Sequence, residues 1–160
     1  MEEKECCPKF DPKPWDEITL EWNEKLFLVD SVPQFMHMPL PGVYGKTITR
    51  MWELARKNDA TPELNDFLLL AYDPSPWKSI QYLSLTKDIP GANVEKLSGT
   101  YISKVFDGPY KDAPKYIKET EKYIQTIGRT SKKYYFYYTT CPKCAKKYGH
   151  NYIVVIVEIQ

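Results

Sequence analysis

Two cysteines and a nearby histidine have the types and spacing that metal or thiol chemistry requires. Cys141 and Cys144 have the Cys-Pro-x-Cys spacing of a zinc knuckle. A structural zinc site needs four ligands, and the chain has no second Cys-x-x-Cys. The other ligands would have to come from His150, His37, Cys6 or Cys7. Zinc is therefore a possible cofactor held by Cys141, Cys144 and His150; a redox-active thiol pair and two unreactive thiols in a turn are the other interpretations.

Acid–base chemistry near neutral pH rests on few side chains. The chain has two histidines, His37 and His150, and imidazole ordinarily titrates in this range. His37 is expected either to line a ligand site or to be a half-buried strand residue. Glu53, Asp73 and Glu95 are candidate carboxylates, although a general base among them would need burial to raise its pKa. These patterns assign no catalytic residue.

Aromatic side chains are the candidates for holding a flat ligand. They make up 14% of the chain, with 13 tyrosines and 4 tryptophans. Strand alternation places Tyr135 and Tyr137 on one face, so Tyr134, Phe136 and Tyr138 face the other way. One set alone can line a groove, and the alternation does not decide which. The predicted ligand-binding residues are His37, Trp52, Tyr72, Trp77, Tyr82, Tyr101 and Tyr137.

The elements that must position these residues are predicted in one order twice, as strand, helix, strand and strand. Gly42-Val43-Tyr44 precedes the first helical pattern, and Gly108-Pro109-Tyr110 precedes the second. The apolar spacing predicts helices over residues 46–57 and 113–127, with Gly128 as a C-terminal cap. Strands are predicted at residues 34–38, 67–72, 80–85, 101–106, 133–140 and 152–159.

This order predicts an α+β fold. Two pseudo-repeated units, at about residues 31–87 and 99–160, would form a curved antiparallel sheet with two helices on one side. Residues 1–30 are expected to be an irregular arm with a possible short strand, and residues 31–160 a small-molecule-binding domain. Ligand clefts tend to lie where two halves meet. We therefore expect the ligand between the repeats.

Charge and hydropathy exclude several classes of function. The 22 basic and 21 acidic residues give a formal charge of +1, without the basic excess of a nucleic-acid-binding surface. The first residues lack the apolar region of a secretory signal, and the longest apolar run, residues 153–157, is too short to span a bilayer. We expect a cytoplasmic monomer or homodimer whose partner is a small molecule, with neither nucleic acid nor membrane involved.

The double pattern, with Gly-x-Tyr before each helix, resembles the GyrI-like small-molecule-binding family. The stretch Gly99-Thr-Tyr-Ile-Ser-Lys-Val-Phe-Asp-Gly-Pro-Tyr110 carries most of this resemblance, which covers about residues 34–160. The Cys-Pro-Lys-Cys segment is similar to that of stand-alone members, some of which are labelled hydrolases. Many drug sensors of the family have an acidic residue at the start of the final strand, where this chain has Asn151-Tyr152. A lipophilic cation is therefore not the expected ligand.

The resemblance implies a stand-alone protein that holds an apolar or aromatic compound in the cleft between its repeats. A hydrolase of a strained or electrophilic, cyclopropane-type xenobiotic in the same cleft, serving detoxification, is the alternative. A third interpretation is a zinc- or thiol-dependent interaction module that uses Cys141 and Cys144. An ionisable group beside the ligand would favour the enzyme, an aromatic and dry site the binding protein, and bound metal the module.

Overall fold

The computed structural model describes residues 10–63, 66–139 and 146–160. The chain forms two compact units, which are described separately below. Unit 1 comprises Met1–Glu21 and Gly99–Gln160, and unit 2 comprises Trp22–Ser98. Both units mix helix with antiparallel strands, so the fold combines α and β structure. None of the helices within the described residues is long and apolar enough to cross a bilayer.

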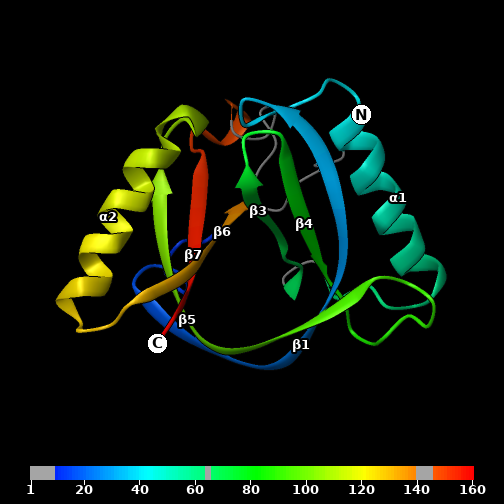
Figure 1. The fold of residues 1–160 in the computed structure, drawn as a ribbon, viewed down its shortest axis with the longest axis horizontal. Coiled ribbons are helices and arrows are strands. Elements are labelled where there is room, and N and C mark those ends of the chain that lie inside the picture. The colour runs from blue at the N-terminus through cyan, green and yellow to red at the C-terminus, as the bar shows by residue number, and fades with distance from the viewer. Residues whose placement is uncertain (1–9, 64–65, 140–145) are drawn as a thin grey trace. The chain divides into compact units, whose positions relative to one another are not determined.

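Unit 2 contains one helix and an antiparallel group of strands, drawn in Figure 1. Strand β1 pairs with β2 and β4, and β4 pairs with β3, which gives the order β2-β1-β4-β3. The elements of this unit are β1 (Ile18–Phe35, whose first four residues belong to unit 1), β2 (Met38–Pro39), α1 (Val43–Lys57), β3 (Leu69–Ser75) and β4 (Lys78–Ser84).

Helix α1 confirms the first helical prediction. It buries Thr47, Met51 and Ala55, which are four positions apart and therefore lie on one helical face. The helix ends at Asn58, whose backbone N–H donates to the carbonyl oxygen of Ala55. Its buried face packs on a cluster that includes Leu28 and Leu83 from the strands. This cluster is the core of unit 2.

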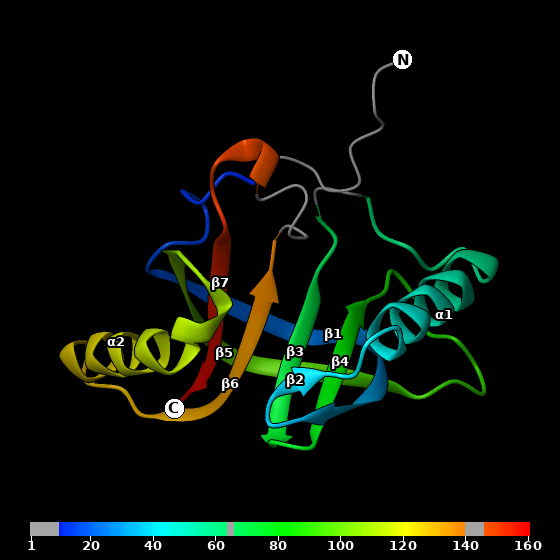
Figure 2. The same ribbon diagram turned by 90° about the horizontal axis from the view of Figure 1, so that it is seen from above.

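Unit 1 has the order strand, 3-10 turn, helix, strand and strand. Strand β7 lies between β6 and β5 and pairs antiparallel with both. Seen from above in Figure 2, α2 lies beside the strands of its own unit. The elements are β5 (Val94–Asp107, whose first five residues belong to unit 2), the short 3-10 turn η2 (Tyr110–Asp112), α2 (Ala113–Thr126), β6 (Ser131–Tyr138) and β7 (Tyr152–Ile159).

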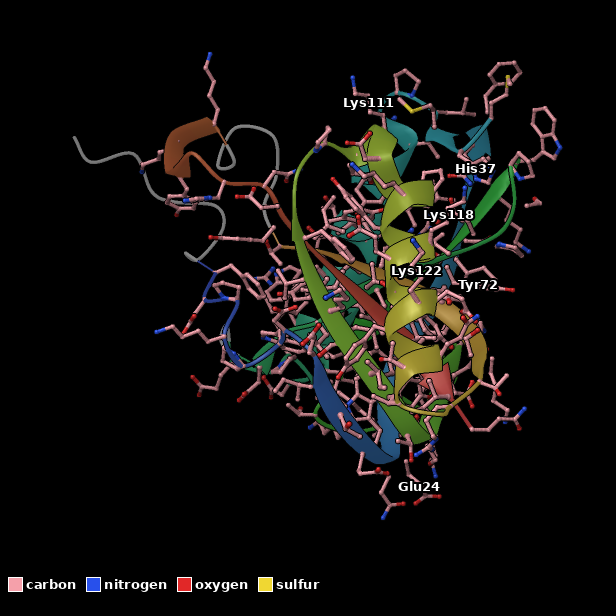
Figure 3. The ribbon with its side chains drawn as sticks, turned by 90° about the vertical axis from the view of Figure 1, so that its left-hand side faces the viewer. Glu24, His37, Tyr72, Lys111, Lys118 and Lys122 are labelled. Carbon is pink, nitrogen blue, oxygen red and sulfur yellow. The ribbon has the colours of Figure 1, made fainter. Side chains whose placement is uncertain are left out.

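Helix α2 has an apolar and a basic side. Tyr116, Thr120 and Ile124 are buried, and the core of unit 1 joins Tyr116 and Ile124 to alternate residues of β7. Lys118 and Lys122 lie on the outward side, as Figure 3 shows. The helix stops where Gly128 adopts a left-handed conformation with a φ of 71°, as the sequence predicts for a C-terminal cap. Helix α2 therefore packs on the face of β7 that carries Ile153, Val155 and Val157.

Two strands differ from their predicted bounds. The sequence suggests only a short strand before residue 30, but β1 runs for 18 residues. Its early part alternates half-buried Leu20 and Trp22 with exposed polar residues, a period-two pattern that charged residues obscure. The strand predicted at residues 34–38 is instead a hairpin, because Met36 and His37 have positive φ values of 49° and 67° and join β1 to β2.

Candidate functional site

Helix α2 packs on one face of the unit 1 sheet, and the described residues of the opposite face include polar and aromatic side chains. Ile153, Val155 and Val157 of β7 pack in the α2 core, so Tyr152, Val154, Ile156 and Glu158 point the other way. Register then places side chains of the neighbouring strands on this second face. We call it the helix-free face, and it comprises Tyr101, Ser103, Val105, Asp107, Lys133, Tyr135, Tyr137, Tyr152, Val154, Ile156 and Glu158.

Four aromatic side chains from three segments meet on this face. The ring centroid of Phe10 lies 5.8 Å from that of Tyr152 and 6.1 Å from that of Tyr137. The ring of Trp15 lies 5.9 Å from Tyr137 and 6.4 Å from Phe10. All four side chains are partly exposed, whereas Tyr101 and Tyr135 are buried. We call Phe10, Trp15, Tyr137 and Tyr152 the aromatic cluster.

Hydrogen bonds hold the N-terminal segment against strand β5 and so fix the aromatic cluster. The Ser103 hydroxyl donates to the carbonyl oxygen of Trp15 over 2.6 Å. The backbone N–H of Val105 donates to the Asp16 carboxylate at 3.1 Å, and Lys104 forms a 3.0 Å ion pair with Glu17. Ser103 is fully buried, so the loss of its bond would leave a polar group unsatisfied. Residues near the start of the chain therefore belong to the site.

A histidine–aspartate pair lies at the end of the aromatic cluster. The Nδ1 atom of His150 lies 2.7 Å from Oδ2 of Asp107. The imidazole stacks on Tyr152, with ring centroids 5.0 Å apart and planes inclined by 11°. About half of each side chain is exposed, 51% for His150 and 44% for Asp107. The pair is therefore open to water and continuous with the aromatic surface.

The backbone clamps Asp107 from its other side. Its Oδ1 atom accepts the backbone N–H of Asn151 at 2.9 Å, and the Asn151 amide donates to the Gly108 carbonyl at 2.7 Å. Burial raises the pKa of the Asp107 carboxyl, but the bonds from His150 and Asn151 and the charge of the imidazole outweigh it and lower the pKa overall. Asp107 is thus held as a carboxylate with both oxygens engaged.

Tyr101 is the second group on the helix-free face whose pKa is shifted. Burial raises the pKa of Tyr101 to about 12, and the nearby Glu158 carboxylate contributes to the shift. The phenol therefore stays neutral across the physiological range and keeps its hydroxyl proton. Glu158 also approaches Lys132 at 4.0 Å.

The other histidine forms a looser pair in unit 2. His37 Nδ1 lies 3.3 Å from Asp73 Oδ2, and Figure 3 labels this histidine near the hairpin that it helps to form. The hairpin carries exposed apolar side chains, among them Met36, Met38 and Phe35, whose ring lies 5.6 Å from that of Trp77. His37 and Trp77 therefore lie together at the tips of the β1–β2 and β3–β4 hairpins.

The remaining predicted ligand-binding residues of unit 2 lie in two places. Tyr82 is buried and packs edge-on against Phe27. Tyr72 lies in the neighbouring strand, where it pairs with Ile80. Trp52 packs against Phe67 at 5.3 Å beside the α1 core. In unit 1, Tyr101 and Tyr137 share the helix-free face.

The zinc prediction concerns residues that are mostly outside the described part of the chain. Cys141, Cys144, Cys6 and Cys7 all lie there. Among the described residues, no group of three or more His, Cys, Asp or Glu side chains could hold a metal ion. Of the two described histidines in the set, His150 has Nδ1 bonded to Asp107 and His37 has Nδ1 paired with Asp73. The zinc site stays a prediction.

Sequence reasoning did not select Asp107, Phe10, Trp15 or Tyr152. Asp107 was visible only as part of an Asp-Gly-Pro turn, and its role depends on the pairing of β5 with β7, where it lies opposite Tyr152. That pairing joins strands separated by a helix and another strand, so no local spacing reports it. For Phe10 and Trp15, the signal was two aromatic residues within a proline-rich segment.

The comparisons with known proteins agree with this architecture. Residues 1–159 match the model of a family described as bacterial hydrolase. The chain belongs to the bacterial hydrolase family. No curated protein matches this family member.

Solved structures of low sequence identity share the fold. An uncharacterized conserved protein from Listeria innocua has a TM-score of 0.67 at 10% identity, covering 91% of this chain and 92% of that one. A hydrolase from Listeria innocua has a TM-score of 0.66 at 12% identity, with the same coverage. SAV2435, solved bound to tetraphenylphosphonium, has a TM-score of 0.50 at 10% identity, covering 91% and 94%. At these identities the likeness shows the fold alone, and it is consistent with the GyrI-like fold.

Proposed function

We propose that this bacterial hydrolase family member binds a small, flat and largely apolar molecule on the helix-free face of unit 1. The aromatic cluster carries the proposal, because four partly exposed rings from three segments meet there, with the centroids of four ring pairs 5.8–6.4 Å apart. Aromatic rings attract one another in offset or edge-to-face arrangements at centroid distances of about 4.5–7 Å, so partly exposed rings can accept the ring of a ligand in the same way. The ligand-bound structure of SAV2435, which shares the fold, gives independent support.

The polar groups of the same face would orient the ligand. Tyr101 is 1% exposed and keeps its hydroxyl proton because burial and Glu158 raise its pKa to about 12, so the ligand would contact the exposed polar groups instead. The Asp107–His150 pair lies at the exposed end of the aromatic cluster, next to Tyr152. A few convergent polar groups beside apolar walls are typical of small-molecule sites.

A hydrolase of an electrophilic xenobiotic is the second candidate function. The family description and the hydrolase from Listeria innocua with the same fold both favour it. The observation in this chain that favours it is the exposed His150–Asp107 pair next to the aromatic cluster. Both candidates place the small molecule on the same surface.

Binding of the neutral dye Nile red tests the first proposal. Tyr137→Ala removes the ring that contacts both Phe10 and Trp15, so dye affinity should weaken by about 1–2 kcal/mol. Fluorescence titration measures this change, and circular dichroism checks the fold. Phe35→Ala is the matched control, since it removes an exposed aromatic side chain from unit 2. Equal affinities of the native protein and folded Tyr137→Ala would contradict the proposed site.

A further inference from the structure

We infer that His150 is the general base of a hydrolytic reaction and that Asp107 is its positioning residue. The inference rests on the proposed function, because the aromatic cluster would hold the substrate. Its substrate class is an ester of a flat, apolar aryl alcohol. The aryl group suits the cluster, and the carbonyl carbon supplies an electrophile that water can attack.

The hydrogen bonds of Asp107 set the proton arrangement of the imidazole. A carboxylate only accepts hydrogen bonds, so the 2.7 Å contact requires the proton on Nδ1 of His150. In the neutral ring, Nε2 then carries the lone pair. The described residues provide no hydrogen-bond partner for Nε2, and 51% of the side chain is exposed. This is the tautomer that a general base needs.

Two further contacts fix the orientation of the His150 ring, one directly and one through Asp107. Tyr152 stacks against it at 11°, and the backbone N–H of Asn151 holds the second oxygen of Asp107. An Asp–His pair that was only a surface ion pair would not need both oxygens of the carboxylate to be engaged. The same features place the imidazole as the last ring of a row that runs through Tyr152 and Phe10 to Tyr137.

The reaction balances without any other reactant. Nε2 accepts a proton from water while the water oxygen forms a bond to the ester carbonyl carbon. The tetrahedral intermediate then breaks its bond to the aryl oxygen, and the proton on Nε2 passes to the departing aryloxide. The products are a carboxylic acid and an aryl alcohol. Asp107 stabilises the transient imidazolium, as a carboxylate beside a catalytic histidine does.

The His37–Asp73 pair provides a matched control within the same chain. Its contact is longer, 3.3 Å against 2.7 Å. The side chain of His37 is similarly exposed, at 58%, but it lies in a hairpin turn of unit 2. A variant at this position removes the same chemical group from the protein. It should leave hydrolysis unchanged.

The test measures hydrolysis of 4-nitrophenyl acetate by the full chain after treatment with a chelator. His150→Gln should lower kcat at least about tenfold, the lower range of general-base effects, while His37→Gln keeps the native rate. Asp107→Asn should lower kcat with KM unchanged, because it alters the tautomer and not the substrate surface. The native rate should show a normal solvent deuterium isotope effect, which a merely structural role would not produce.

Several results would overturn the inference. These are equal rates for native protein and His150→Gln, an equal loss in His37→Gln, a rate that disappears when metal is removed, or the absence of an isotope effect. Nile red binding measured on His150→Gln separates the two proposals. Retained binding with retained hydrolysis would reject the base and leave the ligand site standing. If the native protein fails to bind the dye and His150→Gln still loses the hydrolysis rate, the result supports the base and rejects the ligand site.

Discussion

At the scale of single residues, the absence of a side chain at Gly108 sets the geometry beside Asp107. A Cβ atom built at Gly108 would collide with the Tyr116 hydroxyl, which donates to the Pro109 carbonyl oxygen at 3.0 Å. Gly108 also bonds through its N–H to the carbonyl oxygen of Asn151. A side chain at this position would therefore force the Tyr116 ring to shift and disturb its hydrogen bond to Pro109.

Gly108→Ala should destabilise the protein by about 1–3 kcal/mol, the usual cost of overpacking. Adding Tyr116→Phe should recover part of this loss, because the next atom, Cζ, lies 3.5 Å from the added Cβ. Urea denaturation of the two single variants and the double variant measures the effect. Tyr116→Phe alone should lose only about 0.5–1.5 kcal/mol from its hydrogen bond. A double variant no more stable than Gly108→Ala would show that the collision is not the cause.

The sequence identifies some side chains of the candidate site but does not identify the residues that they contact. Tyr101 and Tyr137 were selected as ligand-binding residues, and they share the helix-free face. The sequence predicts His150 as a zinc ligand, which stays a prediction, and its Nδ1 pairs with Asp107, a carboxylate 43 positions earlier. The sequence also shows no acid at the start of the final strand. The structure supplies one from the neighbouring strand, because Asp107 lies opposite Tyr152.

At the scale of elements, the β1–β2 hairpin carries a strain that the sequence did not reveal. Phe35 pairs with Met38, so Met36 and His37 form a two-residue turn, and both have positive φ. Two-residue hairpins with positive φ strongly prefer Asn-Gly. Residues with larger side chains in this region cost roughly 1–3 kcal/mol each.

The double substitution Met36→Asn and His37→Gly should therefore raise the free energy of unfolding by about 1–2 kcal/mol. Chemical denaturation measures the gain. The control is Met36→Ala with His37→Ala, which removes the same side chains but keeps their backbone requirement and should give no such gain. Equal stability of the two double variants would mean that the turn is not strained.

The two helices were predictable because their apolar spacing is regular and their ends are marked. Asn58 and Gly128 both lie where the periodic pattern stops. The hairpin at residues 36–37 was not predictable, since neither residue favours a left-handed conformation and the apolar run continues through the turn. The pairing of Gln34 N–H with the Trp77 carbonyl, 2.9 Å away, is a tertiary contact that overrides the local pattern.

At the scale of the whole molecule, two buried clusters of the described residues have no member in common. One surrounds α1 and includes Met51 and Leu83, and the other surrounds α2 and includes Ile124 and Val155. The boundary between the units falls inside strands β1 and β5 and not in a loop. The sequence predicts two repeats at about residues 31–87 and 99–160, which stays a prediction. It does not place residues 10–21 in unit 1, where Trp15 and Asp16 hydrogen-bond to β5.

Substitutions in the two cores should have additive effects on stability. Leu83→Ala and Ile124→Ala each remove a fully buried side chain and should each cost about 2–5 kcal/mol. The double variant should equal the sum within about 0.5 kcal/mol, because the two residues share no contact partner in the core clusters. Urea titration followed by circular dichroism provides the three values. A coupling energy well above this margin would show that the two cores respond to each other.

The exposed hairpin of unit 2 also divides the methionines into chemically distinct classes. Met36 and Met38 are 64% and 66% exposed, whereas Met51 is only 2% exposed. Oxidants convert accessible thioethers to polar sulfoxides, a change that methionine sulfoxide reductases reverse. Under oxidative stress the apolar tip around Phe35 and Trp77 would become polar while the α1 core stayed intact. Oxidation would therefore change the polarity of this hairpin's surface and leave the buried α1 core of unit 2 unaltered.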